Sequence, residues 1–113
     1  MPHSAKAKAE WVASASIFAA LGDETRLRLV SRLCDHGPMS ITKLSTGFAI
    51  TRQAITKHLR VMESAGLVCG TPQGREIVWE LEQKRLADAR RHLQTISTQW
   101  DHTLGRLKSF VER

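Results

Sequence analysis

The sequence predicts a mainly α fold with a two-stranded β-wing, in the order α-α-α-α-β-β-α, for a chain that acts as a dimer. Three observations predict it: glycine and proline interrupt helical spacing of apolar residues, the spacing changes to two after Gly66, and helical spacing returns near Lys84. A chain of 113 residues has the size of one domain. We therefore expect a flexible N-terminus over 1–8 and a single domain over 9–113.

The first two helices are predicted from apolar spacing and from the residues that end them. Gly22 interrupts the first helix, which should end near Ala20. Asp23 is a good N-cap for the second helix, because its carboxylate can accept a hydrogen bond from free N–H groups of the first turn. Gly37 and Pro38 end that helix. The first helix carries Trp11, Val12, Ala15, Phe18 and Ala19 at helical spacing, and one face of the second carries Leu27, Val30, Leu33 and Cys34.

Two short helices with similar caps are predicted over 40–66. Ser40 caps the first and Thr51 the second, while Gly47 and Gly66 end them. Two short capped helices joined by a tight glycine-containing turn are typical of a helix-turn-helix motif. The buried stripe of the second helix is expected to comprise Ala54, Ile55, Leu59 and Met62.

A β-wing is predicted over 67–82. A strand from Leu67 to Thr71 and a Pro72-Gln73-Gly74 turn precede apolar residues that alternate with polar ones. Trp79 is expected to be a core residue of the wing rather than a stacking platform, because it shares its face with Ile77 and Leu81.

The closing helix is predicted over 84–112 as a dimerisation helix. Such a helix is about 40 Å long and overhangs a domain of this size, so part of its apolar seam should contact a second chain. The seam comprises Leu86, Ala89, Leu93, Ile96, Trp100, Leu107 and Val111.

Positive charge is concentrated around the two short helices. The net charge is +6, and no Asp or Glu occurs between His36 and Met62. An α-helix fits the major groove, where Arg and Gln can bond to base edges while Lys and Thr suit phosphates. Arg75, beside the tip of the wing, could reach a phosphate or the minor groove. Double-stranded DNA is the predicted partner, and the predicted contacts are Lys43, Thr51, Arg52, Gln53, Thr56, Lys57, His58, Arg60 and Arg75.

Other interpretations of this surface stay open from the residues alone. A charged helix face can simply be solvated, and Arg75 can be an ordinary turn residue. The same face could serve a non-specific architectural or protein-interaction module. His58 falls between the buried stripe and the exposed face, so it can be a packed or capping residue rather than a base reader, and its expected DNA contact is a phosphate.

Composition excludes several other classes. Two cysteines cannot form a disulfide framework and no signal segment opens the chain, so a cytoplasmic protein is expected. The apolar stretches fall far below the roughly twenty residues that cross a bilayer, so no membrane role is expected. No Ser/His/Asp or Cys/His set and no glycine-rich phosphate loop has a recognisable spacing. We therefore expect neither an enzyme nor a cofactor.

Five segments, in this order, carry a resemblance over nearly the whole chain. They are 20–27 (ALGDETRL), 40–44 (SITKL), 52–62 (RQAITKHLRVM), 65–68 (AGLV) and 74–76 (GRE). Together they resemble the ArsR/SmtB family of bacterial winged helix-turn-helix repressors. The tail, 96–101 (ISTQWD) with 107–112 (LKSFVE), is similar to the branch often encoded beside START-domain proteins of the AHSA1 type.

This resemblance implies a homodimer held by the first and last helices. Two recognition helices would read half-sites of a near-palindromic operator, with autoregulation and with repression lifted by an unidentified signal. The implied interface residues are Trp11, Ala15, Phe18, Leu93, Ile96, Trp100 and Leu104, for which periodicity alone is equally compatible with an intramolecular core.

A metal-responsive repressor is one alternative. The cysteine motif of the family's metal and arsenic sensors falls on Ser40 and Thr42, so that site is missing. The family's other common metal site lies on the last helix, where the nearest candidate ligands in this sequence are Asp88, His92 and His102. We expect no metal, because an Asp and a His four residues apart are usually a surface pair.

A thiol-redox-responsive repressor is the other alternative, using Cys34 and Cys69. Nothing in the sequence places them within the roughly 6 Å between Cα atoms that a disulfide requires. Cys34-Asp35-His36 is a second constellation, but a cysteine on an apolar helix stripe is most often a small buried hydrophobe.

Overall fold

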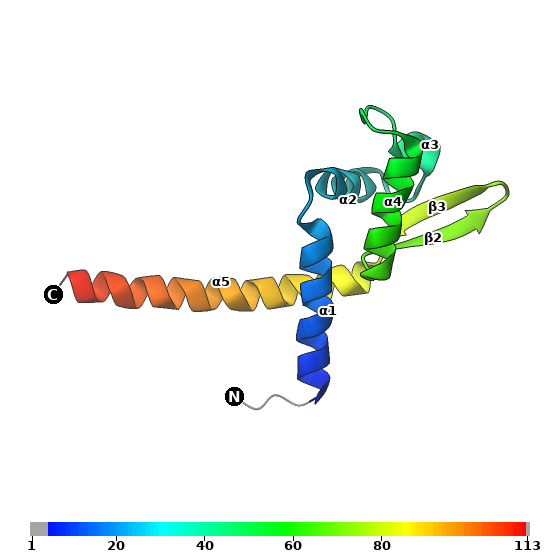
Figure 1. Cartoon of the computed structure of the whole chain (residues 1–113). Helices are drawn as coiled ribbons and strands as arrows, with labels where there is room; N and C mark the ends of the chain where they lie inside the picture. Colours follow the sequence, from blue (N-terminus) through cyan, green and yellow to red (C-terminus); the bar gives the residue numbers. More distant parts are fainter. Residues whose placement is uncertain (1–4, 113) are drawn as a thin grey trace.

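The computed structural model describes residues 5–112, and its helices and strands follow the predicted order with one added strand. A compact group of short elements lies at one end of the molecule, and two longer helices, α1 and α5, cross below it (Figure 1). The elements are α1 (Ala5–Leu21), α2 (Glu24–His36), β1 (Met39–Ser40), α3 (Ile41–Leu44), α4 (Arg52–Ser64), β2 (Val68–Gln73), β3 (Glu76–Leu81) and α5 (Gln83–Val111).

The N-terminal helix is longer than predicted. Residues 5–8, which were expected in a flexible N-terminus, form the first turns of α1, and residues 1–4 of that segment lie outside the described residues. Small and basic side chains at these positions gave no apolar spacing, although alanine and lysine both favour helix.

Helix α2 has the predicted ends, and its buried face includes Val30 and Leu33 of the predicted stripe. The Asp23 carboxylate accepts a hydrogen bond from the Arg26 N–H at 3.0 Å, and Gly37 has a φ of 77° where the helix ends. Leu27, with 52% of its surface exposed, and Cys34 are both outside the core, which corrects the predicted stripe. The residues of α2 that are buried are Leu29, Val30 and Leu33.

Helix α4 begins and ends as predicted. The Thr51 hydroxyl accepts a hydrogen bond from the Ala54 N–H at 3.1 Å. At the other end Gly66 has a φ of 80°, and the Leu67 N–H donates to the Met62 carbonyl at 2.9 Å, which is the long bond of a Schellman motif. Ser40 precedes α3 as predicted, but its hydroxyl makes no capping bond.

The wing is part of a three-stranded antiparallel sheet in the order β1-β3-β2. Met39 pairs with Trp79 and Ser40 with Val78, so β1 adds a third strand to the predicted two. A two-residue strand has no period of its own, and only its tertiary partner reveals it. The hairpin turns at residues 74–75, so the predicted turn residues Pro72 and Gln73 belong to β2.

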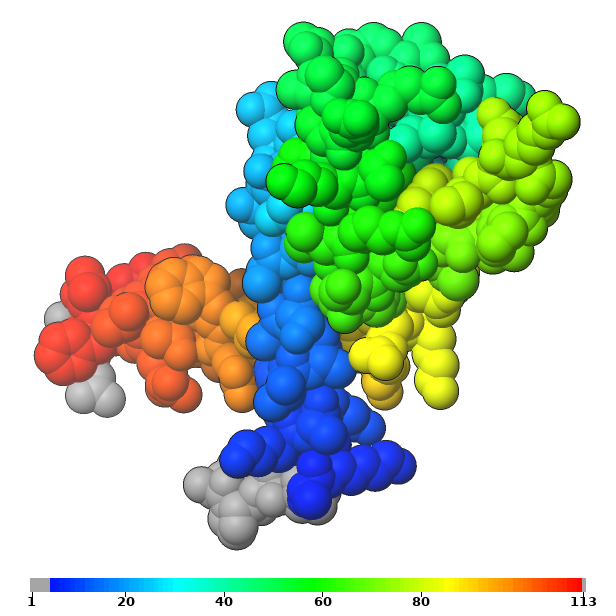
Figure 2. Space-filling model, turned by 45° about the vertical axis from the view of Figure 1, so that its right-hand side comes forward, coloured from blue at the N-terminus to red at the C-terminus, as the bar shows by residue number. Residues whose placement is uncertain are grey.

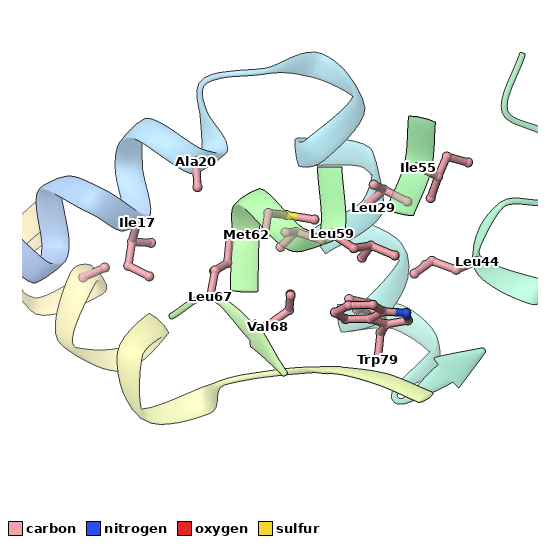
Figure 3. Packing of buried hydrophobic residues seen from close by; sticks show 13 residues of the cluster. Ile17, Ala20, Leu29, Leu44, Ile55, Leu59, Met62, Leu67, Val68 and Trp79 are labelled. Atoms are coloured by element: carbon pink, nitrogen blue, oxygen red, sulfur yellow. The ribbon is translucent and has the colours of Figure 1, made fainter. Parts of the chain in front are cut away.

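The core lies between α2, α4 and the sheet, and α1 and α5 close one end of it. Trp79 is 1% exposed and lies among side chains from α2, α3 and α4 (Figure 3). This confirms its predicted packing role. Ile55, Leu59 and Met62 of the predicted α4 stripe are fully buried, and Ala54 is half-buried. Within residues 5–112, no helix is both long and apolar enough to span a membrane.

Gly70→Ala is expected to destabilise the domain by about 1–3 kcal/mol, because β2 lies directly against the Trp79 ring. A Cβ at Gly70 would lie 2.9 Å from Trp79 Cζ3 and 3.0 Å from Ile77 Cγ2. Denaturant unfolding would measure the loss. The matched control is Gly105→Ala in α5, where nothing lies within 4 Å of the added Cβ and a gain of about 0.5–1 kcal/mol is expected. Equal effects of the two changes would contradict the packing argument.

Candidate DNA-binding surface

Helix α4 is amphipathic, with its apolar side turned into the core and a polar side facing solvent. Arg52, Gln53, Lys57 and Arg60 are exposed, and Thr56 is half-buried. In Figure 1 the helix is drawn in front of the compact group, with the hairpin beside it. Its polar face is therefore open to a ligand of macromolecular size.

Four predicted contact residues have side chains that are exposed and unengaged. Among residues 5–112, the side chains of Lys43, Gln53, Lys57 and Arg75 make no hydrogen bond, ion pair or ring contact. These residues come from α3, from α4 and from the turn of the wing. Amide and cationic groups with no internal partner are free to bond to bases and phosphates.

Arg52 connects three elements of the surface. It donates to the Thr42 hydroxyl of α3 at 3.0 Å, and that hydroxyl donates to Glu76 of β3 at 3.4 Å. The hydroxyls of Thr51 and Thr56 are engaged within α4, as a cap and as a donor to the Arg52 carbonyl at 2.9 Å. Among the predicted DNA contacts, Arg52, Thr51 and Thr56 therefore have side chains that are already hydrogen-bonded within the protein.

Arg60 and Glu63 attach the end of α4 to the wing. The Arg60 guanidinium lies 5.0 Å from the centre of the Trp79 ring and donates to Glu63 at 2.7 Å. The other Glu63 oxygen accepts from the Gly70 N–H of β2 at 3.2 Å. The hydrogen bond from Arg60, together with that from Gly70, lowers the pKa of the Glu63 carboxyl below its usual value of 4.5.

Glu63→Gln is expected to make the domain less sensitive to acid. Because the pKa of Glu63 is lowered on folding, its carboxylate stabilises the fold above the unfolded value of 4.5, and this contribution is lost as pH falls through the folded pKa. The free-energy gap between wild type and Glu63→Gln should therefore narrow as the pH falls below about 5. Urea unfolding across this range measures it. A gap that stays constant with pH would contradict the assignment.

His58 lies toward the start of α2. Its Nδ1 is 3.2 Å from Arg26 and 3.9 Å from the Asp23 carboxylate. Arg26 also donates to the Ala20 carbonyl at 2.6 Å. The backbone N–H of Arg26, with further contributions from the Arg26 and His58 charges, lowers the pKa of Asp23. His58 therefore joins α4 to the α1–α2 corner, and its contact with DNA stays a prediction.

A clamp on the connection between α3 and α4 was not predicted. Arg32 of α2 donates to the carbonyls of Leu44, at 2.9 Å, and of Thr46. The Arg32 and Arg28 guanidiniums both lie over the Phe48 ring, at 4.8 and 4.5 Å from its centre. The clamp holds the turn before the recognition helix. In the sequence, the aromatic residue Phe48 in the turn was the one signal of this clamp. Contacts between an arginine and a distant element leave no spacing pattern.

The predicted dimer residues lie on α1 and α5, and all but Phe18 are exposed in the single chain. Trp100 is 61% exposed and Phe18 is half-buried against the core. The C-terminal part of α5 stands clear of the rest of the chain (Figures 1 and 2). The other predicted residues, all exposed, are Trp11, Ala15, Leu93, Ile96 and Leu104.

The residues of the predicted metal alternative have other partners. His92 stacks on Trp11, with ring centres 4.1 Å apart, and hydrogen-bonds to the buried Ser14 hydroxyl. Asp88 pairs with Arg91. In the part of the chain that the structure describes, no group of three or more His, Cys, Asp or Glu side chains could hold a metal ion.

The predicted thiol alternative involves two separate free cysteines. Cys34 is exposed at the end of α2, and Cys69 is half-buried in β2.

A short helix, a longer helix with an open basic face and a β-hairpin beside it define a winged helix-turn-helix DNA-binding domain. The Helix-turn-helix domain family matches residues 21–69. The chain is 38% identical over 81 residues to the HTH-type transcriptional regulator Rv2034 of Mycobacterium tuberculosis, covering 72% of this chain and 75% of that protein.

Solved structures agree with this assignment. An ArsR-like transcriptional regulator from Rhodococcus sp. RHA1 superposes with a TM-score of 0.71 at 36% identity, over 88% of this chain and 93% of that chain. A homodimeric winged helix-turn-helix domain from Mycobacterium bovis shares the fold, with a TM-score of 0.66 at 19% identity over 89% and 91% of the two chains. The chain belongs to the ArsR/SmtB family of winged helix-turn-helix transcriptional regulators.

Proposed function

We propose that this protein is a homodimeric repressor that binds a near-palindromic operator in its own promoter. The observation that carries the proposal is the open face of α4, where Gln53 and Lys57 are exposed and have no side-chain partner within residues 5–112. Such a face can enter the major groove of DNA while side chains at its edges bind the phosphate backbone of the duplex. A bacterial transcriptional regulator acts on the chromosome, so the proposal includes a cytoplasmic location.

Each side chain has a proposed role that follows from its surroundings. Gln53 reads a base edge, since an amide can bond to adenine in bidentate fashion. Lys57, Lys43 and Arg75 bind phosphates as free cations. Arg52, held by Thr42, contacts DNA from a fixed position at the start of α4.

Arg60 and His58 act mainly within the protein. Arg60 is bonded to Glu63 and lies over Trp79, and His58 faces Arg26 and Asp23. We propose that both place the recognition helix and that neither reads bases.

The dimer is proposed from the apolar face of α1 and α5. Side chains as large as Trp100 and Leu93 are more than half exposed in the single chain, and apolar surface gains about 25 cal/mol per Å² on burial. The Mycobacterium bovis domain that shares this fold is homodimeric, which supports a dimer here. A dimer presents two recognition helices, which suits half-sites about one helical turn of DNA apart.

Gln53→Ala and Lys57→Ala are expected to weaken operator binding in different ways. Gln53→Ala should relax preference at one base pair of each half-site by about 1–3 kcal/mol. Lys57→Ala should weaken binding to all sequences and reduce the slope of log affinity against log salt by about 0.9 for each phosphate that the lysine no longer neutralises. Titrations of operator and mutated operator at several salt concentrations would measure both. Arg90→Ala, an exposed cation on α5, serves as the control and should change neither quantity.

Footprinting on the protein's own promoter tests the repressor itself. We expect a protected palindrome and preference for it over unrelated duplex by about 10³-fold or more. Equal affinity for unrelated duplex would favour a non-specific architectural module instead.

A further inference from the structure

A groove opens between the N-terminal half of α1 and the first turn of α5. It has a volume of 360 Å³, which lies in the range of about 300–1,000 Å³ typical of small-molecule sites. Ala9, Ala13 and Ile17 supply an apolar side from α1. In Figure 2 the space lies between the blue lower half of α1 and the yellow side chains at the start of α5.

The groove and the proposed dimer face use different sides of α1. Residues 9, 13 and 17 line the groove, whereas Trp11 and Ala15 belong to the dimer face. On a helix with 3.6 residues per turn these two sets point in different directions. A ligand could therefore occupy the groove in the dimer.

The charges at the groove favour an anion. Lys6, Lys84 and Arg85 stand against Glu10 and Asp88, and Asp88 is already paired with Arg91. A small excess of positive charge beside an apolar wall suits one negative charge attached to a short hydrocarbon. A planar guanidinium such as that of Arg85 matches a carboxylate in bidentate geometry.

Arg85 also lies close to the end of the recognition helix. Its guanidinium carbon would lie 3.4 Å from a Cβ at Gly66, the residue with a φ of 80° that ends α4. The carbonyl of the next residue, Leu67, accepts a hydrogen bond from the Glu82 N–H at 2.9 Å, directly before α5. A cation near the C-terminus of a helix is favourable because of the free carbonyls there. An anion in the groove would compete for the same guanidinium.

We propose that this groove binds a small organic carboxylate with a short apolar chain, and that binding weakens DNA affinity by drawing Arg85 away from the end of α4. The regulatory half rests on the proposed function, because it requires a DNA-binding state to weaken. The ligand weakens DNA binding only if it binds the free protein more tightly than the DNA-bound protein. Coupling of this kind typically changes DNA affinity by about 5- to 150-fold.

Calorimetric titration of the full chain with sodium hexanoate, without DNA, tests the site. We expect saturable binding of one hexanoate per chain, and weaker binding of hexanol, which has no charge, and of inorganic phosphate, which has no apolar part. Arg85→Gln should weaken hexanoate binding about 10-fold or more, since a hydrogen bond between charged groups is removed. Arg90→Gln, an exposed cation on the same helix outside the groove, is the matched control.

Two results of this titration would overturn the site. One is equal binding of hexanoate and hexanol, and the other is an equal effect of Arg85→Gln and Arg90→Gln. Ala13→Leu, which fills the groove from its apolar side, should abolish hexanoate binding while the circular dichroism spectrum stays unchanged. Retained hexanoate binding in a folded Ala13→Leu variant would also overturn it.

Operator titration with and without saturating hexanoate tests the coupling. We expect hexanoate to lower the operator affinity of wild type about 5-fold or more and to leave that of Arg85→Gln unchanged. Hexanoate binding with no change in operator affinity would overturn the regulatory half alone. A chain that binds no operator would refute the proposed function, and the calorimetric result would still decide the site.

Discussion

Trp100→Glu is expected to convert the proposed dimer to monomers and to remove most of the operator affinity. Trp100 is 61% exposed in the single chain and lies on the C-terminal half of α5. Replacement of a central aromatic anchor typically costs about 2 kcal/mol or more, and a symmetric interface contains the residue twice. A loss of about 4 kcal/mol weakens dimerisation about 1,000-fold.

Sedimentation equilibrium at micromolar concentration measures the effect on assembly. Thr98→Glu is the matched control, because it places the same charge on a different side of the same helix. Operator affinity should fall in parallel with the dimer, since a monomer engages one half-site. A Trp100→Glu variant that stays dimeric would show that the apolar face of α5 has another occupant.

Local features of the fold could be predicted because single residues determine them. Asp23 and Thr51 occupy N-cap positions whose side-chain hydrogen bonds form within three residues, and Gly66 supplies the positive φ that ends α4. These signals depend on neighbours in the chain, so spacing and residue type were sufficient to find them.

Features that depend on distant partners were missed. The strand at residues 39–40 exists because Trp79 and Val78 pair with it. Leu27 was placed in the core because it fits helical spacing, although the buried side of α2 is set by contact with α4 and the sheet. Spacing identifies a stripe to within about one residue, and tertiary packing decides which edge of that stripe is covered.

The same limit applies to the DNA-binding surface. Residue type predicted that the polar residues on the open face of α4 all contact DNA, but the structure distinguishes free side chains such as Lys57 from engaged ones. Arg60 is engaged by Glu63 and Trp79, which lie three and nineteen residues away. The nearer partner was within reach of sequence spacing, whereas the Trp79 contact required the fold. Residue type alone could therefore indicate the surface, but it could not show which of its side chains are free and which are engaged within the protein.

Trp79→Ala is expected to lower the free energy of unfolding by about 3–5 kcal/mol. That is a large share of the roughly 5–15 kcal/mol that stabilises a typical domain. The ring is 1% exposed, packs against Gly70 and lies beneath the Arg60 guanidinium, so its removal leaves a cavity between the wing and α4. Denaturant unfolding followed by circular dichroism measures the loss.

Trp79→Phe distinguishes the two contributions of the ring. It keeps an aromatic surface for Arg60 and removes less volume, so we expect a smaller loss of stability than in Trp79→Ala. Arg60→Ala should remove only the cation–π contact and the bond to Glu63, which are together worth about 1–2 kcal/mol at a partly exposed site. If Arg60→Ala proved as destabilising as Trp79→Ala, the ion pair rather than the buried ring would hold the wing against the recognition helix.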